Sequence, residues 1–298
     1  MRVLLTGGSG FLGSYIYKTL ANNHEVITIG RSKKNIIQAN FNKELPKLPE
    51  VDWVIHAASP AHFIPKTAVE KQSFFDVNVT GTERLLKGLT ELPKIFVFIS
   101  TVAVYGLDEG EMIMESASLD ADTPYGKSKI EAECLIQNWA KENGVKTFIL
   151  RLPLVVGKNP PGNLSAIAKA IKNKIYFRIG KGENKKSMVL AEDVARLIPH
   201  LEDKKPGIYH LCDPQPASLS EIDSSIASLY GYKVKTLPDL PIILAAKLGD
   251  LFPFFPINSL KFKKLTNTLT FDTGKAISEL GWKPNSVLDF LKNNTITS

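Results

Sequence analysis

The first twenty residues constrain the fold most strongly, because they read as a strand, a glycine-rich turn and a helix. Residues 2–6 form an apolar run that predicts a buried strand, and residues 12–20 then repeat apolar positions at helical spacing. Three glycines lie three positions apart, at Gly7, Gly10 and Gly13. Glycine lets the backbone approach a pyrophosphate, whose charge is met by free N–H groups at the helix start. By itself, this stretch fits a phosphate cradle or an ordinary glycine loop equally well.

Strand and helix patterns continue to alternate as far as residue 153. The predicted strands are residues 25–29, 51–58, 95–99 and 145–150, and the predicted helices are residues 69–89 and 125–143. Near-continuous apolar strands that alternate with helices are typical of an α/β fold with a doubly wound parallel sheet. Such sheets bind ligands at the carboxyl ends of their strands. After residue 153 the pattern is less regular and prolines recur, which predicts a smaller substrate lobe.

A second motif, Tyr125-Gly-Lys-Ser-Lys129, carries acid/base chemistry. Residues four apart on a helix share one face, so the Tyr125 phenol and the Lys129 ammonium are expected side by side. A tyrosine has a reference pKa of about 10, and a neighbouring cation lowers it. We therefore expect Lys129 to lower the pKa of Tyr125, with a cationic nicotinamide adding to the effect. Together, the two motifs predict a nicotinamide-dependent enzyme.

These motifs resemble the extended short-chain dehydrogenase/reductases, the family of NAD-dependent epimerases and dehydratases that act on nucleotide sugars. Further stretches match this family in its own order, at residues 52–59, 78–82, 100–106, 191–195 and 280–284. The resemblance covers nearly the whole chain and implies a Rossmann-like fold. Residues 1–153 would form the NAD(P)-binding domain, with residues 184–212 returning to it. Residues 154–298 would form mainly a smaller, discontinuous C-terminal substrate lobe.

The resemblance also implies a role for particular residues. Tyr125 would be the general acid/base, Lys129 would tune it and hold the nicotinamide ribose, and Thr101 would hydrogen-bond the reacting oxygen. The implied cofactor contacts, besides Tyr125 and Lys129, are Gly7, Gly10, Phe11, Leu12, Gly13, Arg31, Asn40, Ala57, Ala58, Ser59, Asn78, Ser100 and Pro153. The implied substrate contacts, besides Thr101, are Asn163, Leu164 and Lys186.

Some positions depart from the family pattern and narrow the function. The predicted second strand ends in Gly30-Arg-Ser-Lys33, and an arginine there suits a 2'-phosphate, so NADP(H) is favoured over NAD(H). Asn40 stands where the family has an adenine-contacting aspartate. Val102 and Ala103 replace the Asp-Glu pair of dehydratases, which argues against water elimination.

The expected activity is therefore 4-ketoreduction or 4-epimerisation at C4 of a nucleotide-activated sugar. Two alternatives remain open: an NADPH-dependent reductase of small aldehydes or ketones, and a non-catalytic NADP-sensing protein. Family members often form homodimers through helices that correspond to residues 69–89 and 125–143, so a homodimer is a further expectation.

Composition limits the other partners. The net charge of +7 comes without aromatic-basic interleaving, so no nucleic-acid partner is expected. The apolar stretch 240–257 contains Lys247, Asp250 and three prolines, so it is not expected to span a membrane. Met1 leads directly into the first strand without a secretory signal, which predicts a cytoplasmic location. Cys134 and Cys212 are the only cysteines and are expected to be buried, with no metal site.

Overall fold

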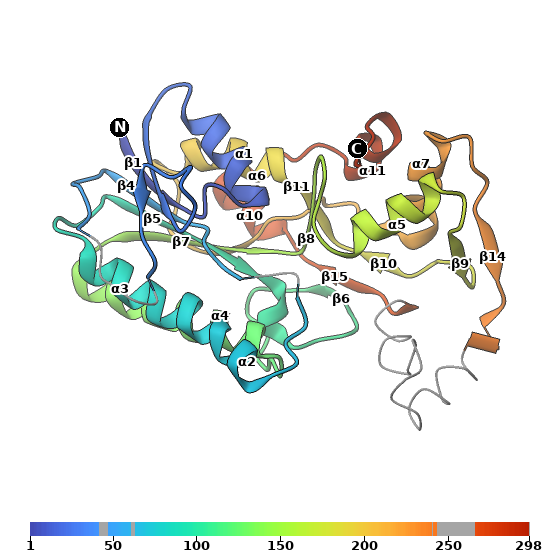
Figure 1. Cartoon of the computed structure of the whole chain (residues 1–298), viewed down its shortest axis with the longest axis horizontal. Helices are drawn as coiled ribbons and strands as arrows, with labels where there is room; N and C mark the ends of the chain where they lie inside the picture. Colours follow the sequence, from blue (N-terminus) through green and yellow to red (C-terminus); the bar gives the residue numbers. More distant parts are fainter. Residues whose placement is uncertain (42–46, 61–62, 240, 243–265, 298) are drawn as a thin grey trace.

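The centre of the molecule is a seven-stranded parallel sheet (Figure 1). This computed structural model describes residues 1–41, 47–60, 63–239, 241–242 and 266–297. In spatial order, the strands are β12 (Gly207–His210), β7 (Lys146–Leu152), β5 (Ile95–Thr101), β4 (Trp53–His56), β1 (Arg2–Thr6), β2 (Glu25–Gly30) and β3 (Ile37–Gln38). The direction in which successive strands are added reverses between β1 and β4. A crevice at such a switch point is where open α/β sheets bind ligands.

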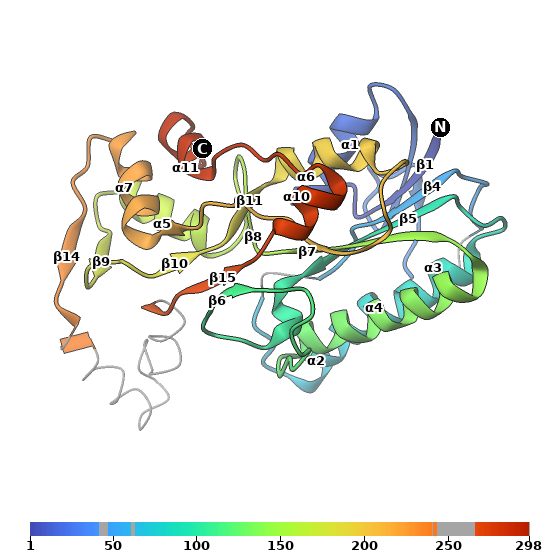
Figure 2. The same ribbon diagram turned by 180° about the vertical axis from the view of Figure 1, so that it is seen from behind.

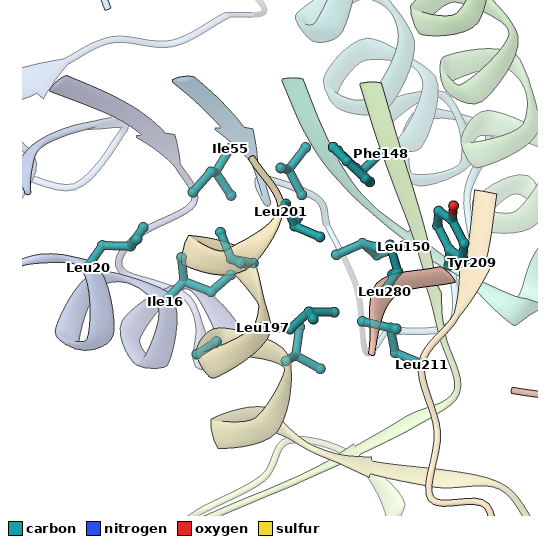
Figure 3. Close-up of a cluster of buried hydrophobic side chains, with 14 of the residues drawn as sticks. Ile16, Leu20, Ile55, Phe148, Leu150, Leu197, Leu201, Tyr209, Leu211 and Leu280 are labelled. Carbon is teal, nitrogen blue, oxygen red and sulfur yellow. The ribbon is translucent and has the colours of Figure 1, made fainter. Parts of the chain in front are cut away.

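Helices cover both faces of this sheet, as Figures 1 and 2 show. One face carries α1 (Phe11–Leu20), α6 (Ala191–Leu197) and α10 (Gly274–Leu280), and the other carries α2 (Ala68–Phe75), α3 (Gly81–Gly88) and α4 (Pro124–Asn143). Side chains of β5 alternate between the two hydrophobic cores, with Ile95 and Val97 in the first and Phe96 and Phe98 in the second. Figure 3 shows Ile16 and Leu20 of α1 in the first core. The predicted doubly wound α/β fold is confirmed.

The helix predicted at residues 69–89 contains a π-helical turn, Asp76–Thr80, between α2 and α3. This turn places Asn78 against α4, where its Nδ2 donates to the Ser128 Oγ at 2.9 Å. The helix predicted at residues 125–143 matches α4 closely, because both ends are fixed locally. Thr123 caps its start, and Gly144 ends it with a φ of 66°.

The rest of the chain forms smaller sheets with their own core. A four-stranded sheet has the order β13 (Ala217–Ser218), β10 (Lys185–Lys186), β15 (Leu269–Phe271) and β6 (Gly110–Ile113). Two strand pairs join β11 (Met188–Leu190) to β8 (Leu154–Val156) and β14 (Lys235–Leu237) to β9 (Phe177–Ile179). Helices α5 (Asn163–Lys172), α7 (Leu219–Ser228) and α11 (Val287–Asn293) pack around this core, which we call the third core.

The two parts of the chain interleave more than the sequence suggested. Within residues 184–212, β12 joins the main sheet and α6 packs on it, whereas β10 and β11 belong to smaller sheets. Conversely, Trp282 lies beyond residue 153 but packs in the first core, where its Nε1 donates to the Cys212 carbonyl at 2.9 Å. These contacts join the two parts of the chain.

Two smaller expectations also have an outcome. Cys212 is buried as predicted, but Cys134 on α4 is exposed, because α4 turns that position away from the sheet. Most of the apolar stretch 240–257 lies outside the described residues. In the part of the chain that the structure describes, no helix is both long enough and apolar enough to cross a bilayer.

Candidate active site

The glycine turn after β1 is held by close backbone packing. Gly7 has a φ of 71°, and a Cβ on it would lie 2.7 Å from the backbone of Ala57 and Ala58. A Cβ on Gly13 would lie 2.0 Å from the Gly7 carbonyl oxygen. These contacts explain the glycines at the first and last positions of the motif. No side chain caps the start of α1 and its first turn carries no acidic residue, so its N–H groups and its positive dipole end can meet an anion.

Two adjoining cavities lie at the carboxyl ends of the strands, on either side of this turn. Their volumes are about 430 and 520 Å³, and both are lined by Gly7, Gly10, Ala57 and Ser59. Of the other predicted site residues, the first cavity has Phe11, Leu12, Gly13, Ser100, Thr101, Tyr125, Lys129 and Pro153, and the second has Arg31, Asn40 and Ala58. A phosphate cradle between two cavities fits a dinucleotide with one nucleoside in each.

Three hydroxyl groups meet in the first cavity. The Tyr125 hydroxyl makes side-chain hydrogen bonds with Thr101 and Ser59. Tyr125 lies in the first turn of α4, Thr101 is the last residue of β5, and Ser59 lies in the loop after β4. The Thr101 Oγ1 also accepts a hydrogen bond from the Ala103 backbone N–H at 3.2 Å. Separate elements therefore bring donors and acceptors to one point, where they can bind a single ligand oxygen and exchange its proton.

Lys129 lies next to this group and is only 1% exposed. Its Nζ donates to the Ile99 carbonyl oxygen at 2.7 Å and lies 4.0 Å from the centre of the Phe98 ring. Burial lowers the pKa of Lys129 to about 7, against an opposing effect of the Glu133 carboxylate. Glu133 is itself fixed by a buried ion pair with Arg151, 2.6 Å long.

The expected effect of Lys129 on Tyr125 is wrong for this geometry. Burial raises the pKa of Tyr125, and the hydrogen bonds to Thr101 and Ser59 only oppose that rise. The physical reason is that burial disfavours the charged form of the phenol more strongly than its polar neighbours favour it. The protein alone therefore keeps the phenol protonated.

Four predicted contacts line neither cavity. Asn78 is 1% exposed and lies behind the site against α4. The Leu164 side chain is 2% exposed within the third core, so only its backbone can meet a ligand. Asn163 is exposed at the start of α5. Lys186 lies on β10, where burial lowers its pKa against the opposing charge of Asp108.

Sequence reasoning missed two features of the site. Glu133 follows Lys129 by four residues, so helical spacing alone could have placed it on the same face. The apolar wall of the first cavity gave no comparable signal, because its residues look like ordinary strand and loop positions. Besides Pro153, that wall includes Leu152, Leu154, Val155 and Pro161.

Comparison with known proteins identifies relatives along most of the chain. Residues 3–212 match the model of the NAD dependent epimerase/dehydratase family. UDP-glucose 4-epimerase from Vibrio cholerae is 28% identical over 96% of this chain and 92% of that protein. Vestitone reductase from Medicago sativa is also 28% identical, over 84% of this chain and 88% of that protein. In structure, UDP-glucuronic acid 4-epimerase from Bacillus cereus is similar with a TM-score of 0.79 and 21% identity, covering 98% of this chain and 97% of that one.

The matched residues run from β1 to just beyond β12 and so include the glycine turn, Thr101, Tyr125 and Lys129. The match agrees with the two cavities that meet at the glycine turn. The chain therefore belongs to the NAD-dependent epimerase/dehydratase family of enzymes.

Proposed function

We propose that the protein carries out NAD(P)-dependent oxidation and reduction at C4 of a nucleotide-activated sugar, as a 4-ketoreductase or a 4-epimerase. The carrying observation is the contact of Tyr125 with Thr101 and Ser59 in a cavity that also contains Lys129. The similarity to UDP-glucose 4-epimerase supports this choice of substrate class and carbon.

The residues divide the proton chemistry between them. Tyr125 exchanges a proton with the C4 oxygen, and Thr101 hydrogen-bonds the same oxygen and so stabilises its developing negative charge. When bound, the nicotinamide ring supplies the hydride acceptor and donor. Lys129, with a pKa of about 7, gains or loses its charge in the working pH range and so changes the charge at the wall of this cavity. The glycine turn holds the diphosphate of the dinucleotide and so fixes the cofactor relative to these residues.

For the cofactor, we propose a preference for NADP(H) over NAD(H). Arg31 follows β2 directly and lines the second cavity together with Ser32 and Asn40. A guanidinium at this position suits a 2'-phosphate, whereas an acidic side chain would suit a free ribose hydroxyl. We also propose that the other dinucleotide contacts are those predicted from the sequence that line the two cavities.

Substrate binding involves residues outside the two cavities. We propose that Asn163 and the backbone of Leu164 bind the substrate diphosphate at the start of α5, with Lys186 adding positive charge. In support, the first turn of this ten-residue helix carries no acidic residue. Leu164 contributes no side-chain contact because it is buried.

Reduction of a small ketone is the second candidate, favoured by the apolar wall around Leu154 and by the similarity to vestitone reductase. Millimolar UDP or dTDP separates the two, because a nucleotide-sugar enzyme gains a higher melting temperature on binding either. No shift in melting temperature, combined with reduction of small ketones, would favour the second candidate.

The main test is a product assay with UDP- and dTDP-linked hexoses and their 4-keto forms. A ketoreductase consumes NADPH in proportion to the alcohol formed, whereas an epimerase converts the sugar with no net change in nicotinamide absorbance. Tyr125→Phe serves as the inactive control in both assays. Absence of turnover with every nucleotide sugar, while the cofactor binds normally, would reject the proposal.

We further propose that two copies pair through α2, α3 and α4, which lie together on one face of the main sheet (Figure 2). Val69 on α2 is 80% exposed, as an apolar contact residue of such a face would be. Light scattering gives the mass directly, and Val69→Lys should shift a dimer towards the monomer.

A further inference from the structure

His56 is the last residue of β4 and lies behind the proposed dinucleotide site, lining neither cavity. It is 2% exposed, and both ring nitrogens have a hydroxyl partner. The Nδ1 lies 2.7 Å from the Thr6 Oγ1, and the Nε2 lies 2.8 Å from the Thr82 Oγ1. Through these two contacts, the His56 ring links β1, β4 and α3.

The directions of these hydrogen bonds follow from their neighbours. The Thr82 hydroxyl donates its proton to the backbone carbonyl oxygen of Asn78 at 2.6 Å. The Thr82 Oγ1 therefore accepts a hydrogen bond from the His56 Nε2–H. The Nδ1 is then the acceptor, and the Thr6 hydroxyl donates to it. The Thr6 oxygen in turn accepts from the Ala58 N–H at 3.0 Å. Burial and the nearby Lys129 lower the pKa of His56 to about 3, so the ring stays neutral with its proton on Nε2.

On the Nδ1 side of His56, this series of hydrogen bonds reaches the proposed dinucleotide site. Ala58 is followed by Ser59, whose side chain hydrogen-bonds Tyr125, and Thr6 immediately precedes the left-handed Gly7. The Thr6 oxygen accepts from the Ala58 N–H, and the Thr6 hydroxyl proton needs an acceptor of its own, which is the His56 Nδ1. His56 therefore fixes the glycine turn and the loop after β4 relative to each other.

The other end reaches the helix that carries Tyr125. Asn78, in the π-helical turn, donates from its Nδ2 to the Ser128 Oγ at 2.9 Å. The Ser128 Oγ donates to the Tyr125 carbonyl oxygen at 2.8 Å, within the first turn of α4. The bonds that leave His56 at its Nε2 side thus extend through Asn78 to the backbone of Tyr125.

We propose that His56 is a positioning residue that sets the cofactor loop through its Nδ1 and the Tyr125 turn through its Nε2. The inference rests on the proposed function, since it assumes that a dinucleotide fills the groove and that Tyr125 carries the chemistry. It predicts two separable defects, one for each ring nitrogen.

Two amide substitutions separate the nitrogens. In His56→Asn, the side-chain oxygen takes the place of the Nδ1 acceptor and the donor to Thr82 is lost. In His56→Gln, the Nε2 amide keeps the donor to Thr82 and the acceptor for Thr6 is lost. Trp53→Phe is the matched control, because Trp53 is a fully buried residue of the same strand and its Nε1 has no hydrogen-bond partner among the described residues.

The dissociation constants of NAD+ and NADP+, the kcat with a nucleotide sugar and the melting temperature without ligand are measured for each variant. For His56→Gln, we expect dinucleotide affinity to fall about tenfold, the usual cost of one unsatisfied buried hydrogen bond. For His56→Asn, we expect affinity within about twofold of the wild type and kcat about tenfold lower. Trp53→Phe should lower the melting temperature but leave the dissociation constants and the kcat unchanged.

The inference is overturned if both histidine variants lose affinity and kcat equally, or if neither constant changes in either variant. Losses that follow the melting temperature across all three variants would mean a purely structural role and would also overturn it. These outcomes differ from failure of the proposed function. A wild-type protein that binds neither dinucleotide would overturn that function, and the inference with it.

Discussion

The Nζ of Lys129 donates a hydrogen bond of 2.7 Å to the carbonyl oxygen of Ile99, two residues before Thr101 on β5. This contact fixes the ammonium to the main sheet beneath the cavity. The same burial that makes the contact possible lowers the pKa of Lys129 to about 7. The charge of Lys129 is therefore linked to folding.

Replacing Lys129 by methionine tests this linkage. The folded pKa of about 7 lies below the reference of 10.5, so from pH 10 down to pH 7 the unfolded chain takes up a proton that the folded chain refuses. The wild type should lose stability relative to Lys129→Met by roughly 1 kcal/mol per pH unit over this range. Urea unfolding at several pH values measures the difference. For Lys127→Met, at an exposed position of α4, the free energy of unfolding should change with pH in parallel with that of the wild type. A Lys129→Met curve that also runs parallel to the wild type would refute the linkage.

Replacing Tyr125 by phenylalanine tests the acid/base assignment. The substitution removes the hydroxyl that contacts Thr101 and Ser59 but keeps the ring. We expect turnover to fall by about 10²- to 10⁴-fold, the usual contribution of a positioned acid/base group, with the cofactor dissociation constant almost unchanged. Tyr17→Phe, at a 42% exposed position of α1, is the control. Activity retained in Tyr125→Phe would transfer the proton chemistry to another residue.

Local signals explain which parts of the molecule could be predicted from the sequence. The positive φ of Gly7 and the approach of Gly13 to the Gly7 carbonyl are encoded within a few residues, whereas the packing of Gly7 against Ala57 and Ala58 is not. The ends of α4 are fixed in the same way, by Thr123 and Gly144. Such features need no knowledge of distant parts of the chain, so the strand, turn and helix at the start and the helix with Tyr125 were predicted almost to the residue.

Long-range features could not be predicted in this way. The short strand β6 pairs with β15 far along the chain, and neither has a hydrophobic pattern long enough to indicate its partner. The pKa of Tyr125 was predicted in the wrong direction because spacing on a helix does not reveal how deeply the folded chain buries the phenol. Burial, which has the largest effect on the pKa values of both Tyr125 and Lys129, arises only in the folded molecule.

Exchanging the charge at Arg31 tests the proposed cofactor preference. Arg31→Asp would replace a phosphate-binding group by one that accepts bonds from the ribose hydroxyls. We expect the ratio of NADP+ to NAD+ affinity to fall by about 10- to 100-fold, in line with a charge-assisted hydrogen bond. Titration with each dinucleotide gives the ratio. Lys33→Asp makes the same charge change on an exposed neighbour that does not line the cavity, so it separates a specific contact from the general field.

The glycine turn gives a final prediction from close backbone contacts. A Cβ on Gly13 would lie 2.0 Å from the Gly7 carbonyl oxygen, whereas one on Gly10 would lie 3.1 Å from the same atom. Gly13→Ala must therefore move the backbone of the cradle, and we expect it to lose about 1–3 kcal/mol of unfolding free energy together with dinucleotide binding.

Gly10→Ala is the matched control, because Gly10 has an ordinary φ of −77° and only a slight shift is needed. It should change the unfolding free energy by less than about 1 kcal/mol. Urea unfolding and dinucleotide titration of both variants make the comparison. Equal destabilisation by the two alanines would mean that the glycine spacing does not arise from contact between the first and last positions of the turn.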